Sequence, residues 1–177
     1  MDAEPIVTKR VLGIAGFKNS GKTTLLVRLV EELTRRGYRL ATVKHAHHSF
    51  DIDHPGRDSY RHREAGAREV AVVSRYRWAL MHELGGLEAD EPSLQEIVDK
   101  LGPCDLVLVE GFKRDRNHFK IEVRDVSQDA PLLAAEDATV IAVAANGAVN
   151  GLKVPVFDRD DGRGLADFVV AWAGLQR

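Results

Sequence analysis

The stretch Gly16-Phe17-Lys18-Asn19-Ser20-Gly21-Lys22-Thr23 matches the phosphate-binding pattern G-x-x-x-x-G-K-[ST] at every specified position. Residues 10–15, directly before it, contain an apolar run that suits a β-strand, and residues 23–36, directly after it, repeat their apolar side chains at helical spacing. Strand, glycine-bearing loop and helix in this order form the context in which such a loop binds phosphate. The stretch therefore predicts a polyphosphate site; the alternative is a glycine-bearing turn that matches by coincidence.

Each specified residue of this loop has a physical role. Glycines permit the open turn in which backbone N–H groups surround a polyphosphate, and the helix N-terminus adds a favourable field for an anion. Lys22 is expected to reach the β- and γ-phosphates, and the Thr23 hydroxyl to hold Mg²⁺. The predicted cofactor-binding residues of this segment are Gly16, Asn19, Ser20, Gly21, Lys22, Thr23 and Thr24.

A second informative stretch is Asp105-Leu106-Val107-Leu108-Val109-Glu110-Gly111, an apolar run that ends in a carboxylate and a glycine. Such a run is typical of a strand buried on both faces. A Walker B strand ends in the same way, with an acid beside the phosphate loop that reaches Mg²⁺ directly or through water. We predict that Glu110 is a magnesium ligand together with Thr23, and a catalytic residue together with Lys22. The alternative is a solvated acid at a strand end.

Length and composition limit the class of protein. With 177 residues and 44% apolar content, the chain suits one domain with a substantial core, so we expect a single nucleotide-binding domain over residues 1–177. A net charge of −2 argues against a general nucleic-acid binder. The single cysteine, Cys104, is expected to be buried and suits a reducing cytoplasm. No signal peptide and no apolar run of about 18 residues is present, so we expect a cytoplasmic protein without a membrane contact.

The order of elements predicts an α/β fold. The helix after the phosphate loop carries an apolar stripe and stops at Gly37, and residues 38–44 form the next strand, which gives a β-α-β unit and hence a parallel sheet. The whole is predicted to be a three-layer domain of the P-loop NTPase type around a mainly parallel sheet. Further strands are expected at 70–73, 78–81, 105–111, 119–124, 139–144 and 152–157, and further helices at 58–65, 92–101 and from 161 or 162.

Residues 44–56 are polar, rich in histidine and end in Pro-Gly, which predicts a loop at the carboxyl end of a strand, where open α/β sheets place ligands. Three functions are open for it: a transition-metal site using histidines with Asp51 or Asp53, a contact loop for phosphate and Mg²⁺, or a solvated loop. We favour nucleotide contact, because the histidine spacing is irregular and no H-E-x-x-H motif is present. Asp51 and Asp53 are then candidate catalytic residues that act around Mg²⁺ or orient water.

Residues 57–77 are locally basic, with six arginines against three acids. Arginine forks suit phosphate and other planar anions, so this segment could hold a second anionic ligand beside the nucleotide. The alternative is that the arginines are surface charges paired with nearby acids.

These motifs together resemble the molybdopterin-guanine dinucleotide biosynthesis protein B (MobB) family along nearly the whole chain. The P-loop alone belongs to a vast superfamily, but the ordered set is specific. Its marks are Gly21-Lys22-Thr23-Thr24, Val43-Lys44-His45-Ala46-His47-His48, Asp53-His54-Pro55-Gly56-Arg57-Asp58-Ser59-Tyr60, Arg77-Trp78-Ala79-Leu80-Met81, Val109-Glu110-Gly111-Phe112-Lys113 and Gly164-Leu165-Ala166-Asp167-Phe168.

The resemblance implies a GTP-binding, weakly hydrolysing homodimer with Mg²⁺ at its site. It would act as an adaptor for the guanylyltransferase that attaches GMP to molybdopterin in molybdenum cofactor biosynthesis, with molybdopterin as a further candidate ligand. The histidine-rich loop and the arginine-rich segment add His45, His47 and Arg57 to the expected cofactor-binding residues.

Two departures from better-known P-loop enzymes limit the mechanism. The sequence has no Asn-Lys-x-Asp motif, so the preference for guanine rests on the resemblance. Lys18 sits one place later than the loop lysine of dimer-activated ATPases, so it is assigned no catalytic role in a partner's site. Three other functions remain open: a small-molecule kinase, a GTP-driven metal-insertion chaperone, and a structural adaptor that binds nucleotide without turnover.

Overall fold

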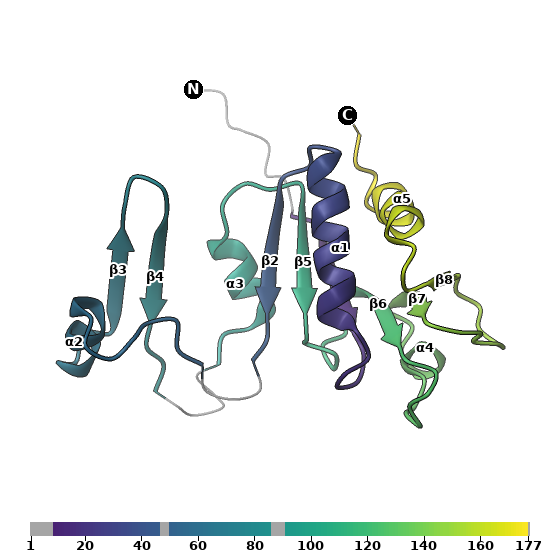
Figure 1. Cartoon of the computed structure of the whole chain (residues 1–177), viewed down its shortest axis with the longest axis horizontal. Coiled ribbons are helices and arrows are strands. Elements are labelled where there is room, and N and C mark those ends of the chain that lie inside the picture. The colour runs from purple at the N-terminus through teal and green to yellow at the C-terminus, as the bar shows by residue number, and fades with distance from the viewer. Residues whose placement is uncertain (1–8, 47–49, 86–90, 177) are drawn as a thin grey trace. The chain divides into compact units, whose positions relative to one another are not determined.

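The computed structural model describes residues 9–46, 50–85 and 91–176 of the chain (Figure 1). The chain forms two compact units, which are described separately: a large unit of Met1–His45 and Ile97–Arg177, and a small unit of Ala46–Glu96. Within the described ranges, no helix has both the length and the apolar composition needed to cross a bilayer.

A six-stranded sheet forms the centre of the large unit, and all of its neighbouring strands pair in parallel. The order across the sheet is β2-β5-β1-β6-β7-β8, so β1 lies between β5 and β6. Parallel strands bring their carboxyl ends to one edge, where the loop after β1 is found. The strands are β1 (Val11–Ala15), β2 (Leu40–Lys44), β5 (Leu106–Glu110), β6 (Phe119–Arg124), β7 (Val140–Ala145) and β8 (Val156–Asp158).

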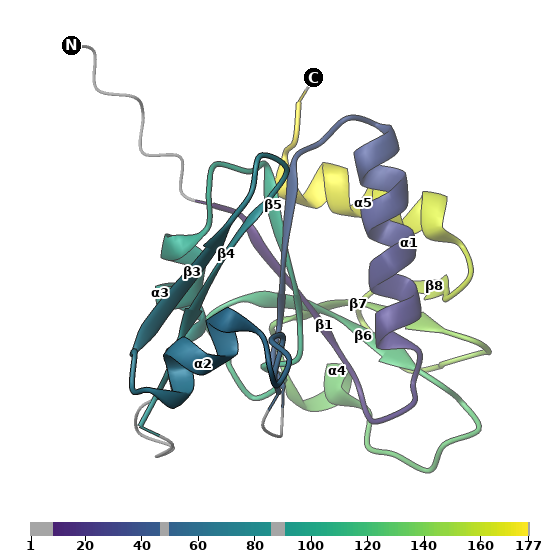
Figure 2. The same ribbon diagram turned by 60° about the vertical axis from the view of Figure 1, so that its left-hand side comes forward.

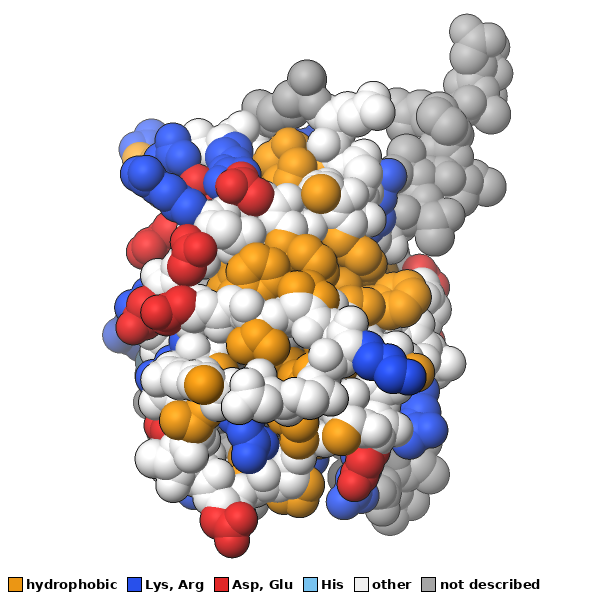
Figure 3. All heavy atoms as spheres, turned by 90° about the vertical axis from the view of Figure 1, so that its right-hand side faces the viewer, with side chains coloured by type: hydrophobic (Ala, Val, Ile, Leu, Met, Phe, Trp, Pro, Cys, Tyr) orange, Lys and Arg blue, Asp and Glu red, His pale blue; other side chains and the backbone are white. Residues whose placement is uncertain are grey.

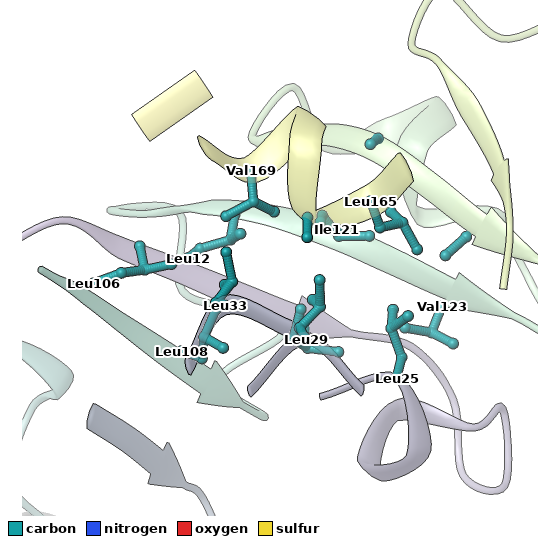
Figure 4. Packing of buried hydrophobic residues seen from close by; sticks show 14 residues of the cluster. Leu12, Leu25, Leu29, Leu33, Leu106, Leu108, Ile121, Val123, Leu165 and Val169 are labelled. Atoms are coloured by element: carbon teal, nitrogen blue, oxygen red, sulfur yellow. The ribbon is translucent and has the colours of Figure 1, made fainter. Parts of the chain in front are cut away.

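Two helices cover one face of this sheet, α1 (Lys22–Arg35) and α5 (Gly162–Ala173), which lie next to each other in Figure 2. Leu25, Leu29 and Leu33 recur every four residues along α1 and are completely buried, as the helical pattern predicted. Complete burial of a leucine side chain is worth roughly 1.5–3 kcal/mol. Figure 4 shows these leucines packed against residues from the sheet and from α5; those labelled are Leu12, Leu106, Leu108, Ile121, Val123, Leu165 and Val169.

The opposite face of the sheet carries buried charge. Side chains alternate along a strand, so Lys120 and Glu122 of β6 point away from the α1 and α5 side that Ile121 and Val123 face. Glu122 accepts hydrogen bonds from backbone N–H groups at the start of the short helix α4 (Leu133–Glu136). Helix, sheet and helix therefore form three layers.

Strand β8 lies at the edge of the sheet. Figure 3 faces this edge and shows hydrophobic side chains gathered in a band across it. Phe157 of β8 and Phe168 of α5 pack in a tilted ring contact with centroids 5.3 Å apart, and Trp172 of α5 meets Phe119 edge to face at 5.9 Å. Such contacts fasten α5 to the strands beneath it.

The small unit contains helix α2 (Asp58–Glu64) and the antiparallel hairpin of β3 (Glu69–Val73) and β4 (Trp78–His82). Helix α3 (Leu94–Lys100) begins within the small unit's range and continues into that of the large unit. It starts with a capping box, in which Glu96 N–H donates to Ser93 Oγ (3.3 Å) and Ser93 N–H donates to Glu96 Oε2 (2.8 Å).

The predicted α/β class with a mainly parallel sheet is confirmed. Two details differ: residues 152–157 yield only the short strand β8, since Pro155 has no N–H for the strand ladder, and α4 was not predicted. The strands expected at 70–73 and 78–81 are confirmed, but they pair with each other and not with the large sheet. The single domain over residues 1–177 stays a prediction.

Candidate functional site

The loop between β1 and α1 has the backbone of a phosphate cradle. Its φ angles are positive at three residues, 148° at Gly16, 62° at Asn19 and 96° at Gly21, and turns of this kind can direct successive N–H groups at an anion. A Cβ at Gly16 would lie 2.4 Å from the carbonyl oxygen of Val123, so only glycine fits there. Ser20 is buried, and its Oγ has no hydrogen-bond partner among the described residues.

Sheet register brings Glu110 to this loop. Ile14 in β1 is paired with Glu110 in β5, and the Thr23 hydroxyl donates a hydrogen bond of 2.9 Å to Glu110 Oε1. Lys22 Nζ donates to the carbonyl oxygen of Phe17 at 2.5 Å, within the loop itself. A threonine hydroxyl and a carboxylate this close are oxygen donors of the kind Mg²⁺ prefers, so the residues present fit the predicted ion. Metal binding itself stays a prediction.

Two further lysines lie at this site. Lys44, the last residue of β2, places Nζ 3.6 Å from Glu110 Oε1. Lys113 places Nζ over the Phe17 ring, 4.9 Å from its centroid. Partial burial lowers the pKa of the Lys22 ammonium; Lys113 and Lys44 lower it further, whereas the attraction of Glu110 opposes the change. The charges around the loop are therefore mainly positive.

The segment that carries Lys113 has an unusual backbone. Gly111 has φ 109° and Phe112, which is not glycine, has φ 47°. A Cβ at Gly111 would lie 2.7 Å from the Cβ of His45, so the segments that carry these two residues approach closely. The Phe112 ring stacks on His45 with centroids 4.5 Å apart, and His45 N–H donates to the Glu110 carbonyl at 2.8 Å. His45, a predicted site residue, therefore supports the chain that leads from Glu110 to Lys113.

Two residues beyond β6 and β8 hold the loop of residues 16–23 from the side away from Glu110. Arg159, just after β8, donates from Nη1 to the carbonyl oxygen of Ser20 at 2.8 Å, and its side chain lies against Gly21. Gln128 donates from Nε2 to the carbonyl oxygen of Lys18 at 3.2 Å. These contacts fix the loop from the side opposite Glu110.

The predicted residues not yet described are Thr24, His47, Asp51, Asp53 and Arg57. Thr24 is exposed on the first turn of α1. Asp51, Asp53 and Arg57 belong to the small unit, where Asp51 pairs with Arg63 at 2.7 Å and Asp53 accepts from Ser59 at 3.0 Å. Their roles in nucleotide chemistry stay predictions, and His47 lies outside the described residues. In the described ranges, no group of three or more His, Cys, Asp or Glu side chains could hold a metal ion.

The sequence did not predict Lys113, Gln128 or Arg159 as site residues, and it predicted Lys44 only as the first residue of the contact loop of residues 44–56. Lys44, Lys113 and Arg159 follow or end strands whose carboxyl ends share the ligand edge, and this rule could have identified them. Gln128 lies four residues beyond the end of β6 in a loop, and no pattern in the sequence marks its contact.

The chain is similar to proteins of one known family along most of its length. Residues 11–146 match the family model described as molybdopterin guanine dinucleotide synthesis protein B, MobB. The molybdopterin-guanine dinucleotide biosynthesis adapter protein of Escherichia coli is 42% identical over 168 residues, covering 94% of each chain, and that of Haemophilus influenzae is 37% identical over 163 residues, covering 92% of this chain and 88% of its own. The crystal structure of a MobB homologue from Bacillus stearothermophilus superposes with a TM-score of 0.71 at 28% identity, over 94% of this chain and 99% of the other.

Proposed function

Because the chain belongs to the MobB family, we propose that it is an adapter in molybdopterin guanine dinucleotide biosynthesis that binds GTP with Mg²⁺ and assists the guanylyltransferase. The family match supports the role in this biosynthesis. The nucleotide and the partner enzyme are proposed from the site and from the family resemblance.

The observation that carries nucleotide binding is the contact between Thr23 and Glu110 beside a loop whose lysine is turned back onto its own backbone. Lys22 gives up the Phe17 carbonyl and reaches the β- and γ-phosphates, while the N–H groups of residues 16–23 surround them. Thr23 and Glu110 hold the Mg²⁺ ion, which neutralises phosphate charge when bound. Hydrolysis is slow, since the sequence offers no arginine finger or water-orienting glutamine in a recognised motif.

The adapter acts as a homodimer, and its exposed hairpin supports this part of the proposal. Residues paired directly across β3 and β4 share a face, and on one face Ala71 and Val73 lie opposite Leu80 and Trp78. Trp78 is 69% exposed and Val73 74% exposed. An apolar sheet face of this kind suits a second copy of the chain.

Substitution of Lys22 tests the nucleotide site. Lys22→Ala removes the charge that contacts the phosphates, and hydrogen bonds to charged groups are worth about 1.5–3 kcal/mol, so we expect GTP affinity to fall at least about tenfold. Isothermal titration with Mg²⁺–GTP measures it.

Lys18→Ala is the matched control, because Lys18 is an exposed lysine of the same loop. It should leave GTP affinity nearly unchanged. Equal GTP affinity in Lys22→Ala and the unmodified protein would contradict the proposed site. A titration with Mg²⁺–ATP completes the set: tighter binding of ATP than GTP would contradict the proposed nucleotide and favour a kinase.

A further inference from the structure

We propose that Lys113 is a second cation of the nucleotide site and contacts the terminal phosphate of a nucleoside triphosphate. The inference rests on the proposed function, because it takes the loop of residues 16–23 to bind a nucleotide. It adds a residue that distinguishes triphosphate from diphosphate.

Lys113 and Lys22 converge on the same residue of the loop. Lys22 Nζ donates a hydrogen bond to the carbonyl oxygen of Phe17, and Lys113 Nζ lies over the ring of Phe17. The first lysine comes from the start of α1 and the second from the chain beyond β5, so two elements bring their ammonium groups to one end of the cradle. A phosphate chain held by Lys22 would extend within reach of a side chain as long as lysine.

The charge balance of the site favours a ligand of high negative charge. The charged groups that act on Lys22 are Glu110, Lys113 and Lys44, so three ammonium groups, Lys22 included, share one carboxylate. That carboxylate already accepts from Thr23 and pairs with Lys44. A triphosphate carries one more negative charge than a diphosphate and neutralises the remaining lysine better.

Lys113 is the lysine suited to this contact. Lys44 is paired with Glu110, whereas the contact of Lys113 is with an aromatic face, which attracts the ammonium without neutralising its charge. Its backbone is held in place by the left-handed conformation of Phe112 and by the stack of Phe112 on His45. A non-glycine residue keeps such a conformation where surrounding contacts fix it, so the backbone from which Lys113 extends is fixed before ligand binds.

The test compares two nucleotides on a set of variants. Dissociation constants for Mg²⁺ with guanosine 5′-[β,γ-imido]triphosphate and with GDP are measured by isothermal titration for the unmodified protein, Lys113→Gln, Lys113→Met, Lys113→Arg and the control Arg114→Gln. Arg114 is the adjacent exposed residue. We expect both neutral variants to lose about tenfold or more in affinity for the triphosphate and less than about twofold for GDP. Lys113→Arg should retain most of the triphosphate affinity, and Arg114→Gln all of it.

The outcomes separate this inference from the proposed function. If the unmodified protein binds neither nucleotide, the proposed function fails, and the inference fails with it. If the unmodified protein binds both but the neutral variants lose both equally, or lose neither, only the role of Lys113 is overturned. The role of Lys113 is also overturned if Lys113→Arg binds the triphosphate as weakly as Lys113→Gln, because the positive charge would then not be the cause of the affinity. Two neutral variants are used so that one remains if the other does not fold.

Discussion

At the scale of single residues, the position of Gly13 in the centre of β1 shows how closely the loop from β5 to β6 packs beneath the sheet. A Cβ on Gly13 would lie 2.7 Å from Nε2 and 2.9 Å from Cδ2 of His118, and 3.0 Å from Cγ of Lys120. Neither side chain is at the surface, since both residues are buried. The chain crosses from β5 to β6 without a helix, and the missing side chain of Gly13 makes room for it.

Gly13→Ala should therefore lower the free energy of unfolding. Adding a methyl group to a filled core forces neighbours to shift and costs about 1–3 kcal/mol. Urea denaturation followed by circular dichroism measures the change. Gly102→Ala is the control, because a Cβ there would meet no atom within 4 Å. Equal urea midpoints for Gly13→Ala and Gly102→Ala would contradict this prediction, because the loop between β5 and β6 would then make room for the methyl group at no cost in stability.

The role of a residue was predictable from the sequence where the residue belongs to a known motif or contacts residues close to it in sequence. The loop of residues 16–23 and the acid Glu110 were found in this way, and the structure places Thr23 against Glu110. Gly13 and Arg159 were not found, because their partners, His118 and Ser20, lie far away in sequence and only the strand order brings them together.

At the scale of elements, a buried ion pair ties β6 to the short segment between α4 and β7. Lys120 Nζ lies 3.1 Å from Asp137 Oδ2 and donates to Thr139 Oγ1 at 2.7 Å. Burial alone would raise the pKa of Asp137, but hydrogen bonds from Thr139 and Lys120 outweigh it and lower the pKa to about 2. The folded protein thus holds Asp137 in its charged form.

The lowered pKa of Asp137 predicts a loss of stability in acid. A carboxyl group whose pKa is lower in the folded state stabilises fully above its unfolded value of 3.8, and this stabilisation is lost as the pH falls towards about 2. It amounts to up to about 2 kcal/mol. Asp137→Asn should be less stable than the unmodified protein at pH 7, and the difference should shrink between pH 4 and pH 2 in urea denaturation.

Asp129→Asn, at an exposed aspartate, is measured in parallel as the control for replacing a carboxyl group by an amide. A constant difference for Asp137→Asn would contradict the role of the ion pair.

Elements were largely predictable because hydrophobic periodicity is a local signal. Every helix and strand expected from residue 10 to residue 173 has a counterpart, with β8 shorter than expected. The four residues of α4 have too few positions for a periodic pattern. The sequence also could not show that β3 and β4 form a separate sheet, since the hydrophobic pattern of a strand does not indicate which strand it pairs with.

At the scale of the whole molecule, the two units differ in their cores. Among the described residues of the small unit, only Val70 and Leu94 are apolar and buried, whereas the large unit has a continuous core between its sheet, α1 and α5. A hairpin with one exposed face is marginally stable in water by itself. The hairpin is therefore expected to become more stable when its face of Ala71, Val73, Trp78 and Leu80 packs against a second copy of the chain.

Trp78→Ser should weaken the proposed homodimer and make the hairpin open more often. Light scattering after size-exclusion chromatography should show a shift towards the monomer, and amide hydrogen exchange in residues 69–82 should become faster while β1 and β5 stay protected. Tyr76→Ser, which removes an exposed aromatic ring from the turn between the strands, is the matched control. An unmodified protein that is monomeric, or a Trp78→Ser variant that remains a dimer with unchanged exchange, would contradict the homodimer.

The central position of β1 also constrains how the chain folds during synthesis. β1 is the first described strand to leave the ribosome, but its two neighbours, β5 and β6, begin only at Leu106 and Phe119. Until β5 has emerged, β1 has neither of its neighbouring strands to pair with, and the loop at its end lacks Glu110. Contacts this distant in sequence make folding slow and leave apolar strands exposed to aggregation. Nascent chains that stop before Leu106 therefore cannot assemble the site, however complete their loop of residues 16–23.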